Sequence, residues 1–514
     1  MIRHLLLGSA LALTASAALP QSEAPMPTTA SAEVRTRAAL GRIEQLNPRL
    51  NAAIAIDPTA LDQARALDRN RRARGPLYGM PILIKDNIET SGPLPTTAGS
   101  LALADNVTNR DAPLVAGLRA AGAVIVGKAN LSEWANIRSS DSISGWSAVG
   151  GQVRNPYALN RNPCGSSSGS AVAVASGMVP AAIGTETDGS ITCPAAINGI
   201  VGFKPSVGLV SRTHVVPISH SQDTPGPMTL NVRDAALIMN AIAGSDPADE
   251  ATAEADRRRV DYTEALRPDA LRGVRIGVMR FSAGFGTDTP FDAALAVLRA
   301  QGAELVEIRE FERRPEFGRA EITVLLAELK HDMNAYLATL PPAVRSRTLA
   351  DLIAFNRAHA EAEMPLFGQD LFEQAEATAG LDEAYRTARE TSLRLAGPEG
   401  IDKLLRDNNV VALIAPTRPA AWLIDSVHGD QSPGGGPAGS LAAVAGYPHL
   451  TVPMGQVRGL PIGLSFIGAK WDDARILALG FAYEQASHAR FEPRLLNSIE
   501  ESPEVAPHLR PAAR

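Results

Sequence analysis

Residues 164–208 read CGSSSGSAVAVASGMVPAAIGTETDGSITCPAAINGIVGFKPSVG, and glycines enclose three consecutive serines, Ser166 to Ser168, near the start of this stretch. A further serine, Ser190, follows in the turn-like segment TETDGS. A glycine- and serine-rich segment can be a flexible linker, a cradle for phosphate, or a place where a hydroxyl acts as a nucleophile. The sequence on either side of it distinguishes these interpretations.

Short apolar runs flank this segment and alternate with helix-like stretches along the chain. Such alternation predicts an α/β layered fold with a buried sheet. The runs are PILIK (81–85), AVIVG (123–127), IVGFK (200–204), VVALIAP (410–416), LTVPMG (450–455) and IGLSFIG (462–468). Near the start of the chain, VRTRAALGRIEQL (34–46) has helical periodicity, and we expect Asn47-Pro48 to end that helix.

The domain organisation follows from where strand-like runs are missing. Charged, Ala-rich segments dominate from about residue 246 to residue 407, which predicts a mostly helical insertion. Strand-like runs return after it, so we expect one domain over residues 31–500 and a C-terminal tail over 501–514. No internal repeat is present in the sequence.

Composition excludes several classes of function. The chain has 514 residues, of which 45% are hydrophobic and 20% charged, and this balance is typical of a globular protein with a large core. The formal net charge is −6, and no basic cluster is dense enough to follow a phosphate backbone. We therefore expect no nucleic-acid partner.

The N-terminus, MIRHLLLGSALALTASAALPQ, has the pattern of a secretory signal peptide. Arg3 precedes an apolar run from Leu5 to Leu13, and Ala15-Ser16-Ala17 supplies small residues for cleavage. We expect residues 1–18 to be removed and residues 19–30 to form a Pro-rich spacer, which places the protein in the periplasm or outside the cell. The apolar run is too short to span a bilayer, so we expect no stable membrane span.

Two familiar glycine motifs fit the sequence poorly. The stretch GAVIVGKA (122–129) approaches a phosphate-binding loop, but Ala129 replaces the Ser or Thr that would bind magnesium. The stretch GSSSG (165–169) matches the nucleophile elbow of esterases, with Ser167 as the attacking residue. A turn-rich segment instead of a buried strand precedes it, and no histidine stands out as its partner. An esterase that uses Ser167 is therefore kept only as an alternative function.

A third combination of residues suits a serine hydrolase without histidine. Lys85 ends the apolar run PILIK, and burial at the edge of a core makes a lysine lose its proton more easily. A neutral lysine can act as a base for a serine hydroxyl.

Taken together, these stretches resemble the amidase signature family. The similarity rests on the glycine–serine segment 164–208, on GPLYGMPILIKDNI from Gly75, and on AGYPHLTVPMGQVRGLPIGLSFIGAKWDDARILALGFAYEQA from Ala445. The resemblance implies that Lys85 is the catalytic lysine, Ser166 the bridging serine after a cis peptide bond, and Ser190 the nucleophile. A Ser-Ser-Lys arrangement of this kind follows the logic of a catalytic triad. The resemblance also implies the layered α/β fold of that family, with a mixed central β-sheet covered by helices on both faces.

The resemblance also directs attention to the turn around the nucleophile. Backbone N–H groups of Thr187, Asp188, Gly189 and Ser190 are expected to form the oxyanion hole, because a glycine beside the nucleophile lets backbone donors approach closely. The Asp188 carboxylate is a candidate for binding a substrate N–H group. Its alternative role is to support the turn.

The segment DGSIT (188–192) departs from the GGSIR pattern of many family members and is most similar to the peptide amidase branch. That resemblance implies hydrolysis of C-terminal peptide amides with release of ammonia. The alternatives are an amidase for small aliphatic or aromatic amides, and a non-catalytic amide-binding protein. The signal peptide argues against a cytosolic amidotransferase subunit that acts on charged transfer RNA.

Only two cysteines occur, Cys164 and Cys193, and each lies within three residues of a predicted catalytic serine. They can form a disulfide or remain buried thiols, and we expect free thiols. The nine histidines show no paired ligand spacing, so we expect neither a metal ion nor another cofactor. We further expect a monomer whose partner is a small-molecule or peptide amide substrate.

Overall fold

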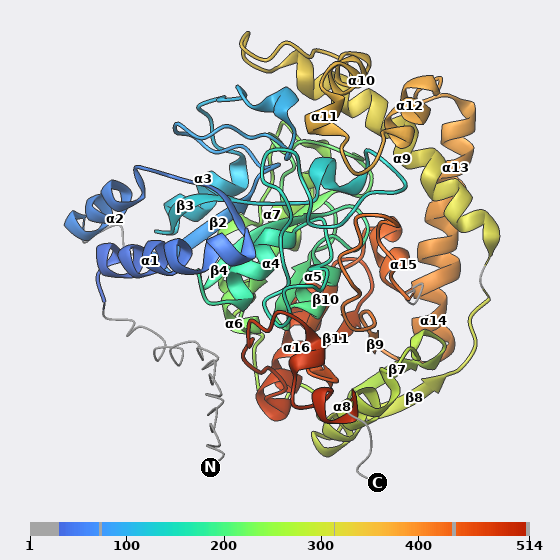
Figure 1. Ribbon diagram of the computed structural model, residues 1–514. Coiled ribbons are helices and arrows are strands. Elements are labelled where there is room, and N and C mark those ends of the chain that lie inside the picture. Colours follow the sequence, from blue (N-terminus) through green and yellow to red (C-terminus); the bar gives the residue numbers. More distant parts are fainter. Residues whose placement is uncertain (1–29, 71–74, 313, 434–437, 510–514) are drawn as a thin grey trace, which may run out of the picture.

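The predicted apolar runs supply six of the eleven strands of one mixed sheet (Figure 1). This computed structural model describes residues 30–70, 75–312, 314–433 and 438–509. The strands are β1 (Ala53–Ile56), β2 (Pro81–Lys85), β3 (Val124–Ala129), β4 (Ala181–Glu186), β5 (Val201–Lys204), β6 (Thr224–Thr229), β7 (Arg275–Met279), β8 (Glu304–Ile308), β9 (Ala412–Pro416), β10 (His449–Val457) and β11 (Leu460–Ile467). All six predicted runs lie in strands of this sheet.

The strand order is β1-β3-β2-β4-β6-β5-β10-β11-β9-β7-β8. Parallel pairs occur at two places, where β2 lies between β3 and β4 and where β7 lies between β9 and β8. Antiparallel pairs join these two parts through the centre of the sheet. The carboxyl ends of β2 and β4 therefore meet at one edge, and this arrangement positions the candidate site.

Helices cover both faces of the sheet, as predicted. Helices α3, α6, α8 and α16 pack on one face of the sheet. Helices α1, α4 and α5 cover the other face, and α14 and α15 cover the same face beside β9. The α-helices are α1 (Ala32–Leu50), α2 (Ala60–Arg69), α3 (Pro113–Ala120), α4 (Ser168–Ala175), α5 (Thr192–Ile197), α6 (Val232–Ile242), α7 (Ala255–Arg258), α8 (Asp288–Ala300), α9 (Pro315–Ala338), α10 (Leu349–Ala358), α11 (Ala360–Glu363), α12 (Asp370–Ala377), α13 (Glu383–Ala396), α14 (Asp402–Asp407), α15 (Ala438–Ala445) and α16 (Asp473–Ser487).

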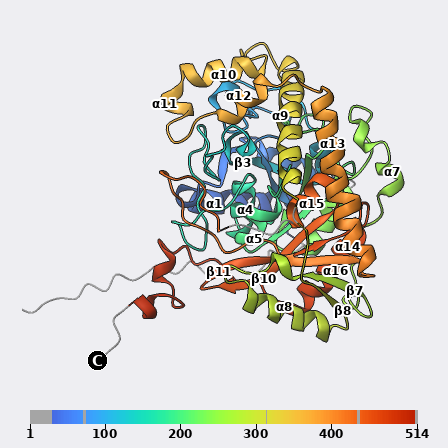
Figure 2. The same cartoon turned by 90° about the vertical axis from the view of Figure 1, so that its right-hand side faces the viewer.

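The predicted helical insertion over 246–407 requires correction. Strands β7 and β8, with α8 between them, lie inside that range and extend the sheet. The helical excursion therefore begins only with α9. Its helices α9, α10, α12 and α13 gather at one end of the molecule, on the opposite side of the sheet from α8 (Figure 2). Residues of α9, α10 and α12 form a separate apolar cluster over the loops around Leu103, Trp134 and Val216.

The first helix also differs from its prediction. Asn47-Pro48 does not end it, because α1 continues through Pro48 to Leu50. A proline removes only one helical hydrogen bond, and here the helix ends two residues later, so little is lost. Asn51 ends the helix in the left-handed conformation, with φ 55°, and its N–H donates to the Asn47 carbonyl.

The predicted signal peptide and spacer lie outside the described residues. Across the part of the chain that is described, no helix has both the length and the apolarity needed to cross a bilayer.

Candidate active site

Lys85 ends β2, where its side chain is fully buried. Side chains alternate along a strand, so Ile82 and Ile84 join the core on one face while Leu83 joins the core that contains α4. Lys85 is in phase with Leu83 and shares the face covered by α4. The parallel neighbour β4 brings Thr185 to the same edge of the sheet.

Three oxygen atoms surround the Lys85 amine. Its Nζ lies 2.7 Å from Ser166 Oγ, 2.8 Å from Thr185 Oγ1 and 3.2 Å from the Thr185 carbonyl oxygen. Asn87 Nδ2 donates to the same Thr185 hydroxyl at 2.9 Å. The structure therefore brings together the predicted pair Lys85 and Ser166, and it adds Thr185 as a partner that the sequence analysis missed.

Burial changes the acidity of this amine. Removal from water lowers the pKa of Lys85 to about 7, and the carboxyl groups of Asp223 and Glu186 oppose that shift only in part. A large fraction of the Lys85 side chains is therefore neutral near pH 7.

Ser166 follows a cis peptide bond after Gly165, as predicted. Its hydroxyl is fully buried, and its carbonyl oxygen accepts a hydrogen bond from Ser132 N at 3.0 Å. A Cβ atom at position 165 would collide with the Ser132 hydroxyl, so glycine is required there by the close approach of the two segments.

Ser190 lies in the turn between β4 and α5. The buried carboxylate of Glu186 closes this turn, because its Oε2 accepts hydrogen bonds from Ile191 N at 2.7 Å and Thr192 N at 2.9 Å. The Ser190 carbonyl oxygen accepts a hydrogen bond from Ser167 N at 3.1 Å, which holds the turn against the segment that carries Ser166. Ser190 is half-buried, whereas Ser166 and Lys85 are fully buried.

The backbone donors of this turn remain available. Within the described ranges, the N–H groups of Thr187, Asp188, Gly189 and Ser190 donate to no protein acceptor. Gly189 has a φ of 84°, a conformation that favours glycine.

The Asp188 side chain is accessible to solvent, yet surrounding protein raises the pKa of its carboxyl group. The Ser440 hydroxyl and the carboxyl group of Glu321 from α9 lie near it. Burial and the neighbouring Asp188 raise the pKa of Glu321 to about 8.

A family model for amidases matches residues 35–477 of this chain. The chain belongs to the amidase family. It is an amide-hydrolysing enzyme, and its fold is that of solved peptide amidases. The crystal structure of native peptide amidase from Stenotrophomonas maltophilia is 51% identical, with a TM-score of 0.85, over 90% of this chain and 95% of that chain.

Two further comparisons agree with this assignment. A structure of a peptide amidase in complex with the competitive inhibitor chymostatin is 52% identical, with a TM-score of 0.86, over 90% of this chain and 96% of that chain. A probable amidase of Arabidopsis thaliana is 41% identical over 474 residues, which is 89% of this chain and 87% of the relative.

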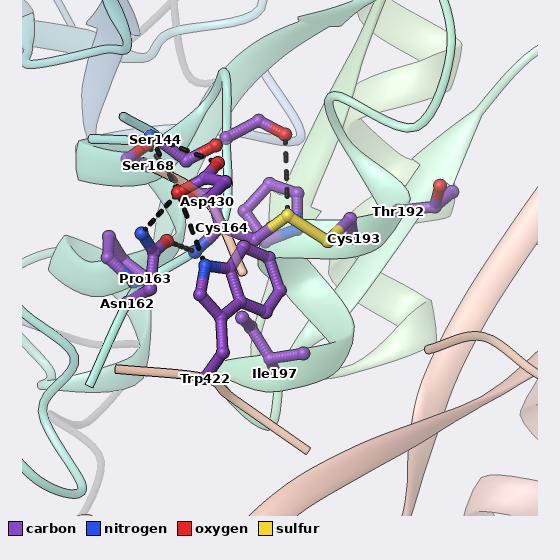
Figure 3. Close-up of a disulfide and its surroundings, with 12 residues drawn as sticks. Ser144, Asn162, Pro163, Cys164, Ser168, Thr192, Cys193, Ile197, Trp422 and Asp430 are labelled. Carbon is purple, nitrogen blue, oxygen red and sulfur yellow. Dashed lines mark hydrogen bonds between the residues drawn. A yellow bond between two sulfur atoms is a disulfide. The ribbon is translucent and has the colours of Figure 1, made fainter. Parts of the chain in front are cut away.

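The amidase has a disulfide between Cys164 and Cys193, so the expectation of free thiols is wrong (Figure 3). The bond between Ser167 N and the Ser190 carbonyl draws the two cysteine-bearing segments together, and the two cysteine Cα atoms lie 6.1 Å apart. That separation is within the range a disulfide can bridge.

Ser167, the candidate nucleophile of the esterase alternative, has a structural role in this amidase. Its hydroxyl is fully buried, donates to the Thr185 carbonyl at 3.1 Å and accepts from Thr185 N at 3.2 Å. The segment before it contains no strand of the kind a nucleophile elbow needs. This position does not support the esterase alternative.

The sequence analysis did not predict three polar residues around the site. Besides Thr185 and Glu186, Asp223 accepts the Thr187 hydroxyl at 2.6 Å and adds negative charge near Lys85. Thr185 and Glu186 end β4, a strand that the sequence analysis did not predict, although the apolar residues before them are a local signal that could have indicated it. Asp223 had no such signal.

Proposed function

We propose that this amidase hydrolyses the C-terminal carboxamide of peptides and releases ammonia. Two observations support this substrate class: the similarity to solved peptide amidases, and the DGSIT segment around Ser190. The observation that carries the mechanism is the buried Lys85 amine, 2.7 Å from the Ser166 hydroxyl.

In this proposal Lys85 is the base. A neutral amine has two hydrogens and one lone pair, and Thr185 offers two acceptors, its Oγ1 and its carbonyl oxygen. When both hydrogens are donated to Thr185, the lone pair is left for the hydroxyl hydrogen of Ser166. The Thr185 acceptors thereby orient the amine as well as bind it.

Ser190 is the proposed nucleophile. Its Oγ attacks the amide carbon while its proton passes to Ser166, which passes its own proton to Lys85. The oxyanion is stabilised by the unoccupied N–H groups of residues 187–190. When the tetrahedral intermediate collapses, its C–N bond breaks. The leaving nitrogen takes a proton back through Ser166 and departs as ammonia. Water then hydrolyses the acyl ester by the same route.

Ammonia release from an N-acetylated dipeptide amide tests the proposal. We expect the mature protein to release ammonia, and we expect Lys85→Ala and Ser190→Ala each to lower kcat by roughly 10³-fold or more, as loss of a unit in a triad does. Matched controls are Ser176→Ala at the end of α4 and Lys403→Ala on the surface of α14, which should both retain full activity.

Several outcomes contradict this proposal in different ways. Retained activity in Lys85→Ala would refute the lysine mechanism. Release from small aliphatic or aromatic amides alone would refute the peptide amide assignment and favour the alternative within the family. Binding without any ammonia release would favour the non-catalytic amide-binding protein.

For Asp188 we propose binding of a substrate N–H group by its carboxylate. The support is that this carboxyl group is accessible while it lies only two residues from Ser190. Asp188→Asn should raise KM for peptide amides with a smaller effect on kcat. Unchanged kinetics on every amide tested would refute the role.

We also propose that the chain is exported and acts in the periplasm or outside the cell. The N-terminal pattern of residues 1–18 supports this, and so does the Cys164–Cys193 disulfide, because disulfides persist mainly in oxidising compartments. Cell fractionation with mass measurement of the mature N-terminus tests it. Uncleaved protein in the cytoplasm would refute it.

A further inference from the structure

A cluster of potential metal ligands lies outside the amidase site, where the loop 218–223 contacts α9. It consists of His220 from the loop and of His331 and Asp332 from the helix. Their ligand atoms all lie within 4.8 Å of one another, and among the described residues this is the one group of three or more such side chains that meets. The two histidines are far apart in the sequence, so no ligand spacing announced the cluster.

Both imidazole rings direct the same atom at the same carboxylate. Nδ1 of His220 lies 3.0 and 2.9 Å from the two carboxylate oxygens of Asp332, and Nδ1 of His331 lies 2.8 Å from Oδ1. Without a metal, these contacts require a proton on each Nδ1. A single cation between the three groups could replace both protons.

The buried carboxylate of Glu328 contacts the other nitrogen of the His220 ring. Nε2 of His220 lies 3.3 Å from Oε1 of Glu328, a fully buried residue whose Oε1 also accepts the Tyr385 hydroxyl at 2.8 Å. Histidines that bind metals commonly donate their second ring N–H to a carboxylate, which fixes the tautomer. Glu328 is placed to hold the proton of His220 on Nε2 and so to free the Nδ1 lone pair.

We propose that His220, His331 and Asp332 form a binding site for a divalent transition-metal ion, with Zn²⁺ as the best match. Imidazole nitrogen and carboxylate oxygen are ordinary zinc ligands, and three protein ligands leave one position for water. The histidine side chains are 42% and 56% exposed, so an ion can reach them from solvent.

An ion at this site would affect the Thr187–Ser190 turn through the contacts of the loop 218–223. Gln222, two residues after His220, donates from Nε2 to the Thr187 carbonyl at 3.3 Å and to Glu321 of α9 at 3.2 Å. A metal that ties the loop to α9 would therefore make the contacts of the loop with the Thr187–Ser190 turn more rigid. Because the site joins two segments distant in sequence, binding should also raise Tm.

The test is zinc binding by the metal-free, untagged mature protein, measured by titration calorimetry and by competition with a chromogenic chelator. We expect one Zn²⁺ per chain, and at least tenfold weaker binding in His331→Ala and Asp332→Asn. Glu328→Gln should weaken binding roughly 10- to 100-fold, the usual effect of losing a carboxylate behind a ligating histidine. Zn²⁺ should raise the Tm of the wild type and leave that of His331→Ala unchanged.

His428→Ala is the matched control, because His428 is an exposed histidine that also pairs with an aspartate, Asp425. It should bind zinc like the wild type. His331 lies on the exposed face of a long helix, so its alanine variant should keep the wild-type circular dichroism spectrum. Absence of stoichiometric zinc binding in the wild type, or equal affinity in His331→Ala, would overturn the proposal. Neither readout depends on amide hydrolysis, so this test is independent of the proposed function.

Discussion

At the scale of single residues, the acidity of Lys85 sets the expected pH dependence of the amidase. Burial lowers its pKa to about 7, so the amine is protonated below that pH and neutral above it. Only the neutral form can take a proton, and kcat/KM should therefore fall about tenfold per pH unit below pH 7. The measurement is a pH profile on an uncharged N-acetylated dipeptide amide between pH 5 and pH 9.

Asp223→Asn supplies the control for that profile. The Asp223 carboxyl group is the largest influence that raises the pKa of Lys85, so its removal should move the lower limb of the profile to lower pH. A profile that stays flat down to pH 5, or one that does not move in this variant, would contradict the role of Lys85 as base.

Thr185 provides a second prediction at this scale. Thr185→Val keeps the size and branching of the side chain but removes the hydroxyl that accepts from Lys85 and Asn87. Hydrogen bonds to charged groups contribute about 1.5–3 kcal/mol, so we expect kcat to fall by tenfold or more while KM changes little. Thr185→Ser should recover most of the rate. Equal kcat values for the valine variant and the wild type would show that Thr185 does not orient the amine.

At the scale of secondary-structure elements, the disulfide joins the segment before α4 to α5. The two cysteines are 29 residues apart in sequence, and closing a loop of that length stabilises a fold by about 3.6 kcal/mol in the chain-entropy model. The double variant Cys164→Ala/Cys193→Ala should lose about that much stability in urea denaturation. Dithiothreitol should lower the denaturation midpoint of the wild type and leave the variant unchanged. Equal midpoints for both proteins would contradict a stabilising disulfide.

Elements and site residues were predictable from the sequence to different degrees. The resemblance to the amidase signature family, which rests on the run PILIK and the glycine–serine segment, predicts Lys85, Ser166 and Ser190 as site residues. The structure brings Lys85 and Ser166 into contact. Strands β7 and β8 were missed because they lie in charged surroundings, and β8 is an edge strand with an exposed first residue. Which strands pair with each other depends on residues far apart in the sequence, so no local pattern predicts it.

The disulfide and Thr185 show why contacts between distant segments could not be predicted from the sequence. A cysteine pair forms only if the fold brings two segments within reach, and hydrogen bonds such as those from Ser167 N to the Ser190 carbonyl and from Asn198 Nδ2 to the Pro163 carbonyl hold the segments together here. Likewise, Thr185 becomes a partner of Lys85 only because β4 pairs with β2 in parallel. Sequence patterns predicted six of the eleven strands and not their order.

At the scale of the whole molecule, α9 connects the helical excursion to the catalytic turn. Glu321 near its start contacts Asp188, and His331 and Asp332 farther along meet the loop that contacts Thr187. Helix α9 thus lies beside the Thr187–Ser190 turn at Glu321, and at His331 and Asp332 it contacts the loop that reaches this turn.

The neighbouring carboxyl groups of Asp188 and Glu321 give a prediction at this scale. The pKa of Glu321 is raised to about 8, so above that pH both carboxyl groups carry charge and repel each other across the contact between α9 and the turn. We expect an upper limb near pH 8 in the kcat/KM profile, separate from the lower limb that Lys85 sets. Glu321→Gln removes the titrating carboxyl group, so it should abolish the upper limb and leave the lower limb in place. An upper limb that persists in this variant would show that the contact between α9 and the catalytic turn does not control activity at high pH.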